Sequence, residues 1–112
     1  MIPTLTVKFY RTESGAEPVR EWLYGLSQMD RKMIGDDIKT VQFGWPLGMP
    51  LVRKLKADLW EVRLQLVGRI ARVVFTVDDG TMVLLHAFIK KSQAMPQADL
   101  ALAAARLKQA RS

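Results

Sequence analysis

The sequence predicts an α+β domain of order βααβββα, in which an antiparallel C-terminal meander is packed by helices. Three observations predict this class. Apolar and polar residues alternate near the N-terminus and in three later segments, as in half-buried strands. Two stretches between them and one after them carry apolar residues at helical spacing. The connectors Val67-Gly68 and Asp78-Asp79-Gly80 are short and turn-like, which favours antiparallel neighbours.

The first half of the chain contains the first strand and both early helices. Residues 4–10 alternate and form the expected strand. Pro18 suits the first position of a short helix that ends near Gly25, and Ser27 can cap the next helix. In that second helix Ile34, Ile38 and Val41 form one apolar stripe. Its charged residues are expected to face solvent: Asp30, Arg31, Asp37 and Lys39.

The second half contains the meander and the last helix. Glycine and proline punctuate residues 44–51, which we expect to be a loop. The three strands of the meander are expected at 59–66, 70–77 and 82–89. Pro96 opens an alanine-rich helix with one apolar stripe, made of Leu100, Ala103, Leu107 and Ala110.

Length and composition predict one domain, residues 1–112, and exclude several function classes. The chain has 112 residues, no cysteine and one histidine. Disulfide scaffolds, cysteine catalysis and His/Cys metal sites are therefore excluded, and no metal or cofactor is expected. We find neither the pattern of a signal peptide nor an apolar run of about 18 residues, so we expect a cytoplasmic protein without a membrane partner.

The charge is uneven along the chain. Basic residues number 17 and acidic residues 11, a formal net charge of +6. Residues 1–51 are balanced, so the whole excess lies in residues 52–112. A basic half-chain attracts polyanions, of which nucleic acid is the commonest in the cytoplasm.

Alternation within the meander groups its polar residues by face. In the last strand His86 and Lys90 alternate in step with Leu84 and Phe88. Neighbouring strands can place one polar set on one side of the sheet, although the pairing register decides whether its members converge. That set is Glu61, Arg63, Arg72, His86 and Lys90.

Two interpretations of this polar set stay open. Charges that alternate with apolar residues are most often a solvated sheet face with weak surface ion pairs, and a histidine in an apolar strand is typical of a hydrogen-bonded core residue. Basic residues at both ends of the meander favour a functional surface instead. They are Arg53, Lys54 and Lys56 upstream, and Lys90 and Lys91 downstream.

Several segments together resemble the phage-derived HigB-like branch of the RelE/ParE toxin superfamily. The resemblance covers nearly the whole chain, and the predicted element order is also similar to that superfamily. The segments are Lys54-Leu55, Leu59-Trp60-Glu61-Val62-Arg63, Arg69-Ile70-Ala71-Arg72-Val73 and Leu84-Leu85-His86-Ala87-Phe88-Ile89-Lys90-Lys91-Ser92-Gln93, followed by Pro96.

The resemblance implies the toxin of a type II toxin–antitoxin pair, which inhibits translation by cutting mRNA on the ribosome. Its partners would be an antitoxin, expected to be a helix-turn-helix protein, the ribosome and mRNA. Such toxins are metal-free ribonucleases in which the ribose 2′-OH attacks phosphorus and leaves a 2′,3′-cyclic phosphate. A ParE-like inhibitor of DNA gyrase and an inactive prophage-derived binding module are the alternatives.

The resemblance also implies roles for single residues. Arg63 and Arg72 match cations that hold the scissile phosphate, and Lys90 or Lys91 matches a phosphate clamp or proton donor. The chain has no tyrosine after Tyr24, so a base-stacking tyrosine expected near the end is missing. The general base stays open between Glu61, His86 and a lysine. RNA contacts are expected from Arg53, Lys54, Lys56, Arg69 and Lys91.

Overall fold

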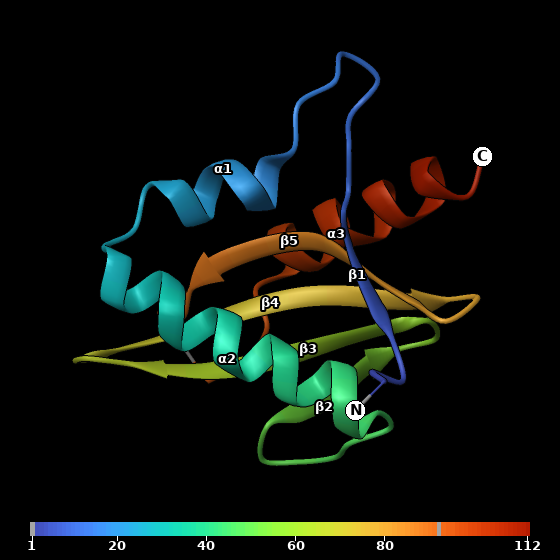
Figure 1. The fold of residues 1–112 in the computed structure, drawn as a ribbon. Helices are drawn as coiled ribbons and strands as arrows, with labels where there is room; N and C mark the ends of the chain where they lie inside the picture. Colours follow the sequence, from blue (N-terminus) through green and yellow to red (C-terminus); the bar gives the residue numbers. More distant parts are fainter. Residues whose placement is uncertain (1, 92) are drawn as a thin grey trace.

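A computed structural model, which describes residues 2–91 and 93–112, confirms the α+β class with a five-stranded sheet and helices on both faces (Figure 1). Within these ranges no helix has both the length and the apolar character needed to cross a bilayer. The elements are β1 (Thr6–Phe9), α1 (Pro18–Tyr24), α2 (Gln28–Gly44), β2 (Val52–Lys56), β3 (Leu59–Leu66), β4 (Arg69–Asp78), β5 (Thr81–Ile89) and α3 (Gln97–Ala110).

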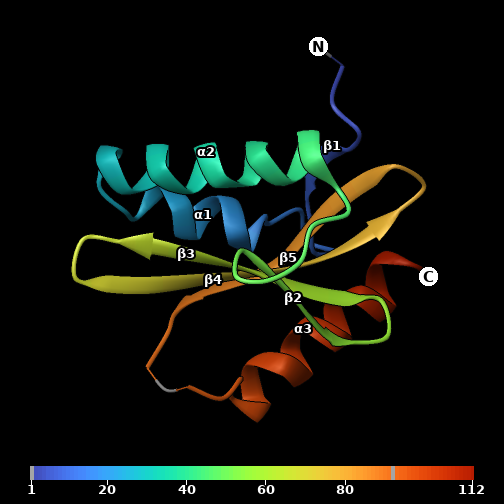
Figure 2. The same cartoon turned by 90° about the horizontal axis from the view of Figure 1, so that it is seen from below.

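The sheet separates the helices into two layers. Its strand order is β1-β5-β4-β3-β2, with β1 parallel to β5 and every other neighbour antiparallel. Helices α1 and α2 cover one face, and α3 crosses the other (Figure 2). The expected connectors are tight turns: Gly68 has a φ of +69°, and Asp79 and Gly80 have φ values of +48° and +75°. Such left-handed residues suit two-residue hairpins, as the sequence predicts.

Strand β2 is an element that the sequence analysis did not predict. It pairs with β3 and makes the observed order βααββββα, so the meander has four strands instead of three. Three of its five residues are basic, and the pattern Val-Arg-Lys-Leu-Lys does not alternate apolar with polar residues. Val52 alone is fully buried there, opposite Val62. Exposed lysines are typical of an edge strand, where they discourage pairing with another chain.

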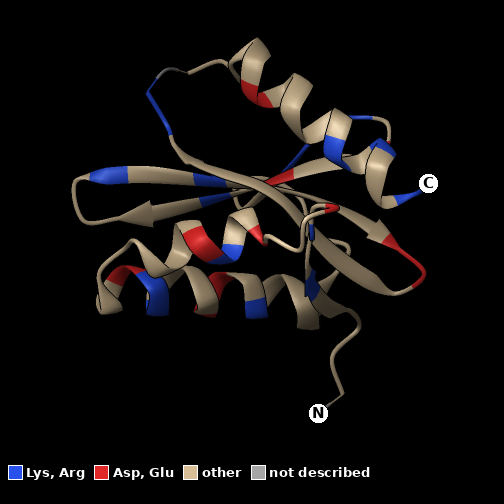
Figure 3. Cartoon of the chain, turned by 90° about the horizontal axis from the view of Figure 1, so that it is seen from above, with Lys and Arg blue, Asp and Glu red and all other residues tan. Residues whose placement is uncertain are grey.

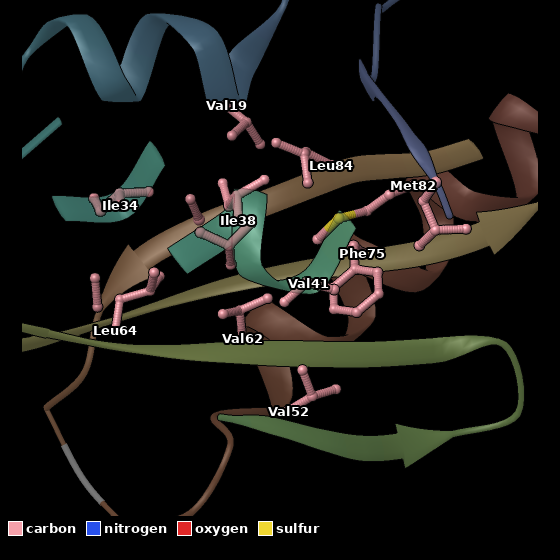
Figure 4. Close-up of a cluster of buried hydrophobic side chains, with 14 of the residues drawn as sticks. Val19, Ile34, Ile38, Val41, Val52, Val62, Leu64, Phe75, Met82 and Leu84 are labelled. Atoms are coloured by element: carbon pink, nitrogen blue, oxygen red, sulfur yellow. The ribbon is translucent and has the colours of Figure 1, made fainter. Parts of the chain in front are cut away.

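The two faces of the sheet bury separate apolar clusters. The larger cluster fills the space between the sheet and helices α1 and α2, and it includes Val19, Ile34 and Phe75 (Figure 4). The smaller cluster lies under α3 and joins Leu59 and Val74 to Ala103 and Leu107, among others. Only part of the second face is apolar, so the rest of that face is available for polar groups.

The beginning of α2 differs from expectation at one residue. Ser27 caps the helix by accepting a hydrogen bond from the backbone N–H of Asp30, as the sequence predicts. Asp30 itself is buried and not solvated, so the prediction for this side chain is wrong. Its carboxylate forms an ion pair with Arg69 at the start of β4. Arg69 compensates the buried charge of Asp30, a partner that helical spacing alone could not predict.

A bulge in β5 breaks the alternation assumed for the last strand. Val74 pairs with His86, whereas the next residue, Phe75, pairs with Leu84. Leu85 is therefore the extra residue, and a β-bulge of this kind changes the faces to which side chains point. Leu84 belongs to the cluster under α1 and α2, while Phe88 packs against the cluster under α3. The prediction that Leu84 shares a face with His86 and Phe88 is wrong for this reason.

The docking of α3 gives a stability test. Ala103 is the fully buried residue of that helix, whereas Ala105 is exposed on it. We expect Ala103→Leu to cost about 1–3 kcal/mol because extra methylene groups overpack a filled site. Ala105→Leu is the matched control and should change the free energy of unfolding by less than about 0.5 kcal/mol. Urea unfolding measures both. Equal effects of the two variants would show that α3 does not pack on the sheet through Ala103.

Candidate active site

The pairing register brings most of the predicted polar set together on the face that α3 covers only in part. Arg63 of β3 lies directly opposite Arg72 of β4, and Arg72 in turn lies opposite Phe88 of β5. Lys90 follows β5, and its backbone N–H donates to the carbonyl of Ile70 beside Arg72. Basic segments therefore meet near the β3–β4 end of the sheet and just after β5 (Figure 3).

Glu61 supplies the negative charge at the centre of this cluster. Its side chain is fully buried, and its two carboxylate oxygens face two different arginines. Oε1 lies 3.1 Å from Nε of Arg53, and Oε2 lies 3.6 Å from Nε of Arg72. Neither oxygen accepts a hydrogen bond from the residues that the structure describes. Since like charges opposite each other in a sheet repel, Glu61 offsets the repulsion between Arg63 and Arg72.

Arg72 is closed off from solvent and is not a surface charge. Its side chain is 1% exposed, and Nη2 donates a 2.9 Å hydrogen bond to the backbone carbonyl of Gln93. Burial lowers the pKa of the Arg72 guanidinium, and the carboxylate of Glu61 opposes that shift. The sequence left open whether this arginine is a catalytic cation, a solvated charge or a partner of Glu61. The burial of Arg72 excludes a solvated charge. Its ion pair with Glu61 is buried on both sides.

Lys90 is a partly exposed cation of the cluster. Its Nζ lies 3.4 Å from the side-chain oxygen of Gln93, which accepts a hydrogen bond from it. Desolvation lowers the pKa of Lys90, and the positive charges of Arg63 and Arg72 lower it further, against the opposing effect of Glu61. An ammonium with a lowered pKa gives up its proton more readily than an ordinary lysine.

An open groove of about 550 Å³ lies beside Lys90, between the β3–β4 turn and the segment after β5. Three cations, Arg69, Lys90 and Lys91, line it together with the amides of Gln65 and Gln93. Among the described residues that line it, none is acidic. The charge of Arg69 is compensated by Asp30, so the two lysines give the groove its positive potential. A groove of this composition suits the phosphates of a single nucleic-acid strand.

His86 is held by the last helix and does not line the groove. Its Nε2 lies 2.6 Å from Oδ1 of Asp99, and its Nδ1 lies 3.4 Å from Nη1 of Arg106. Its ring stacks on Phe88. Both ring nitrogens thus have partners on α3, as expected for a hydrogen-bonded core histidine.

The three basic residues of β2 do not act together. Arg53 pairs with Glu61 and belongs to the cluster. Lys54 instead lies over the ring of Trp60, 5.9 Å from its centroid, and Trp60 packs with Trp45 in the other layer. Lys56 is exposed. The expected basic approach upstream of the meander is therefore reduced to Arg53 at the cluster itself.

Gln93 is a residue of this site to which the sequence analysis assigned no role. Its backbone carbonyl binds Arg72, and its side chain binds Lys90, so it connects the buried and the exposed cation. It follows the last strand in a segment without periodicity, so the one signal that includes it is the resemblance, whose last segment ends at Gln93. Ser92, which the resemblance includes, lies outside the described residues.

Comparison with known families assigns the chain to one of them. The family described as "Phage derived protein Gp49-like (DUF891)" matches residues 21–108, which is most of the chain, and the protein belongs to this family. The match contains α2, all four strands of the meander and most of α3, so it includes every residue of the cationic cluster. No curated protein sequence matches the chain.

The buried pair predicts a large effect of removing one charge. Glu61→Gln leaves Arg72 uncompensated in the interior, and we expect it to cost about 3–5 kcal/mol of unfolding free energy. Glu13→Gln at an exposed position is the matched control and should have almost no effect. The double variant Glu61→Leu/Arg72→Met should recover most of the loss, because an apolar pair replaces the ion pair. Urea unfolding measures the free energy of unfolding of each variant. A Glu61→Gln protein as stable as the parent would contradict the pairing of Glu61 with Arg72.

Proposed function

We propose that this protein is the toxin of a type II toxin–antitoxin pair and that it cuts mRNA bound to the ribosome. The observation that carries the proposal is the convergence of Arg63, Arg72 and Lys90 beside a groove without acidic residues. The family assignment is consistent with a phage-derived toxin. The basic excess of the second half of the chain supplies the attraction for RNA.

The proposed reaction is a metal-free transesterification. The ribose 2′-oxygen loses its proton and attacks the adjacent phosphorus, and the bond from phosphorus to the 5′-oxygen breaks. The products are a 2′,3′-cyclic phosphate and a 5′-hydroxyl. Arg63, with Arg72 opposite it on β4, stabilises the charge of the phosphorane, and the Lys90 ammonium protonates the leaving 5′-oxygen.

The general base is the role for which this site has no well-placed group among Glu61 and His86. Glu61 is fully buried between two arginines, and both nitrogens of His86 have partners on α3. Neither group is placed to take a proton from a ribose in the groove. In our proposal the ribosome or the RNA itself supplies the base, and a base from the ribosome would make the cleavage depend on the ribosome.

The same basic groove would have to be covered while the cell is growing. We propose that the antitoxin does this with acidic side chains that meet Lys90 and Lys91, since complementary charge favours fast and specific association. Co-expression with such a partner should restore growth. A complex that leaves RNA cleavage untouched would contradict this part of the proposal.

Mapping of mRNA 5′ ends in cells that produce the protein tests the function. The proposal expects new ends within translated reading frames and no increase in gyrase-linked DNA breaks. The Lys90→Ala variant should remove the new ends. DNA breaks without new mRNA ends would favour the gyrase alternative and overturn the proposal.

The role of Lys90 can be measured as a rate. Lys90→Ala should lower the rate of cleavage on purified ribosomes by about 10²- to 10³-fold, because one preorganised donor to the transition state is lost. Lys39→Ala removes a lysine that is exposed on α2 and should leave the rate unchanged. The thermal unfolding midpoint of both variants should stay close to that of the parent. A Lys90→Ala protein with the parental rate would exclude Lys90 from the reaction.

The lowered pKa of Lys90 predicts the pH dependence. A proton donor works in its protonated form, so the rate should fall as the pH rises through the pKa of Lys90. Because that pKa is lowered, the fall should come at a lower pH than for an ordinary lysine. Lys90→Arg should lose both this fall and most of the rate, since a guanidinium stays protonated and is a poor proton donor. A parental rate that rises throughout the alkaline range would contradict the role of Lys90 as the acid.

The salt dependence of RNA affinity distinguishes lysines at the two ends of the meander. Each phosphate contact to a single strand contributes about −0.7 to the slope of log affinity against log salt. Lys91 lines the groove, so Lys91→Ala should flatten the slope for ribosome-bound mRNA by about that amount. Lys54→Ala should leave the slope unchanged, because Lys54 lies over Trp60. An equal effect of both variants would mean that RNA does not bind in the groove.

A further inference from the structure

A second hollow lies at the other end of the sheet from the cationic groove. It has a volume of about 360 Å³ and lies between β1, the β4–β5 turn and the C-terminal turn of α3. The groove lies at the first residues of β4 and this pocket at its last residues. A strand of that length spans roughly 30 Å, so the two sites share no residue and are independent.

A buried hydroxyl without a partner lines this pocket. Thr76 is 2% exposed, and its Oγ1 makes no hydrogen bond with the described part of the chain. Nearby Tyr10, 3% exposed, donates its hydroxyl proton to Oε1 of Gln109, which leaves the amide nitrogen of Gln109 as a donor. Leaving a buried hydroxyl unpaired costs free energy, and a turn of the Thr76 side chain toward an acceptor in the pocket would remove that cost.

Basic side chains line the same pocket. Lys8 and Arg11 line the pocket, and neither forms an ion pair with any residue in 2–91 or 93–112. Arg111 also lines it and pairs with Asp58 at 3.1 Å. The acidic side chain in the lining is Asp78, which is exposed. The donors and the charge together favour a ligand that is an anion with several acceptor oxygens.

The apolar side of the pocket and its volume indicate an anion larger than phosphate. Val83 and Leu107 give the pocket an apolar side, and its volume exceeds what a bare phosphate fills. We propose that this pocket binds a small phosphomonoester such as a nucleoside 5′-monophosphate. The phosphate accepts hydrogen bonds from Thr76 and Gln109 and faces Lys8 and Arg11, while the body of the ligand packs on the apolar side.

A nuclear magnetic resonance titration of the whole protein with uridine 5′-monophosphate tests the proposal. Uridine, which lacks the phosphate, is the control ligand. We expect saturable shifts at the amides of Lys8, Thr76 and Gln109 with the nucleotide and none with uridine. Shifts that instead follow Lys90 and Lys91 in the groove, or equal binding of uridine, would overturn it.

Variants make the test specific. Thr76→Val keeps the shape of the side chain and removes the hydroxyl, so affinity should fall by about tenfold or more. Arg11 is exposed, so Arg11→Ala should fold normally and weaken binding in the same way. Lys39→Ala removes an equal charge far from the pocket and should bind as the parent does. Parental affinity in both Thr76→Val and Arg11→Ala would overturn the proposal even if nucleotide binds elsewhere.

Lys90→Ala separates this proposal from the proposed function. It should bind the nucleotide with parental affinity although it is expected to lose RNA cleavage. A protein that binds the nucleotide but never cuts RNA would support the nucleotide site and contradict the proposed function. A Lys90→Ala protein that loses nucleotide binding would show that the ligand occupies the groove, and it would contradict an independent site.

Discussion

The buried pair of Glu61 and Arg72 is the constraint on which the candidate site depends. The register of β3 and β4 sets Arg63 opposite Arg72, and two like charges in that position need a counter-charge nearby. Glu61 supplies it from the same face and also holds Arg53. With Glu61 in place, the cations can be concentrated at one end of the sheet without unfolding it.

This arrangement also positions the segment after β5. Arg72 donates to the backbone carbonyl of Gln93, whose side chain in turn accepts from Lys90. The buried arginine thus fixes the segment that carries the partly exposed Lys90, and its positive charge is one of the causes that lower the pKa of Lys90. On the same face, α3 holds His86 through Asp99 and Arg106 and keeps it out of the groove.

Much of this was predictable from patterns, and the exceptions have physical reasons. Alternation and turn residues predicted β3, β4 and β5 to within a residue at each end, because one apolar face dominates each strand. They could not predict β2, because its basic residues break the alternation of apolar and polar positions. They could not predict the bulge at Leu85 either, because it becomes visible only in the pairing of β4 with β5. Alternation allowed Glu61 and Arg72 to share a face, but it could not show that the register joins them or that both are buried, since these depend on strand pairing and on the contact of Arg72 with Gln93.

The most direct test of the account is the chemistry of the cut ends. Purified protein, intact ribosomes and a defined mRNA are incubated with a chelator of divalent ions at a level that the ribosomes tolerate, and the termini of the fragments are identified by mass spectrometry. Attack by the ribose 2′-oxygen at a cationic site predicts 2′,3′-cyclic phosphate and 5′-hydroxyl ends, lost in Lys90→Ala. Fragments with 5′-phosphate and 3′-hydroxyl ends, or cleavage that persists unchanged in that variant, would contradict it.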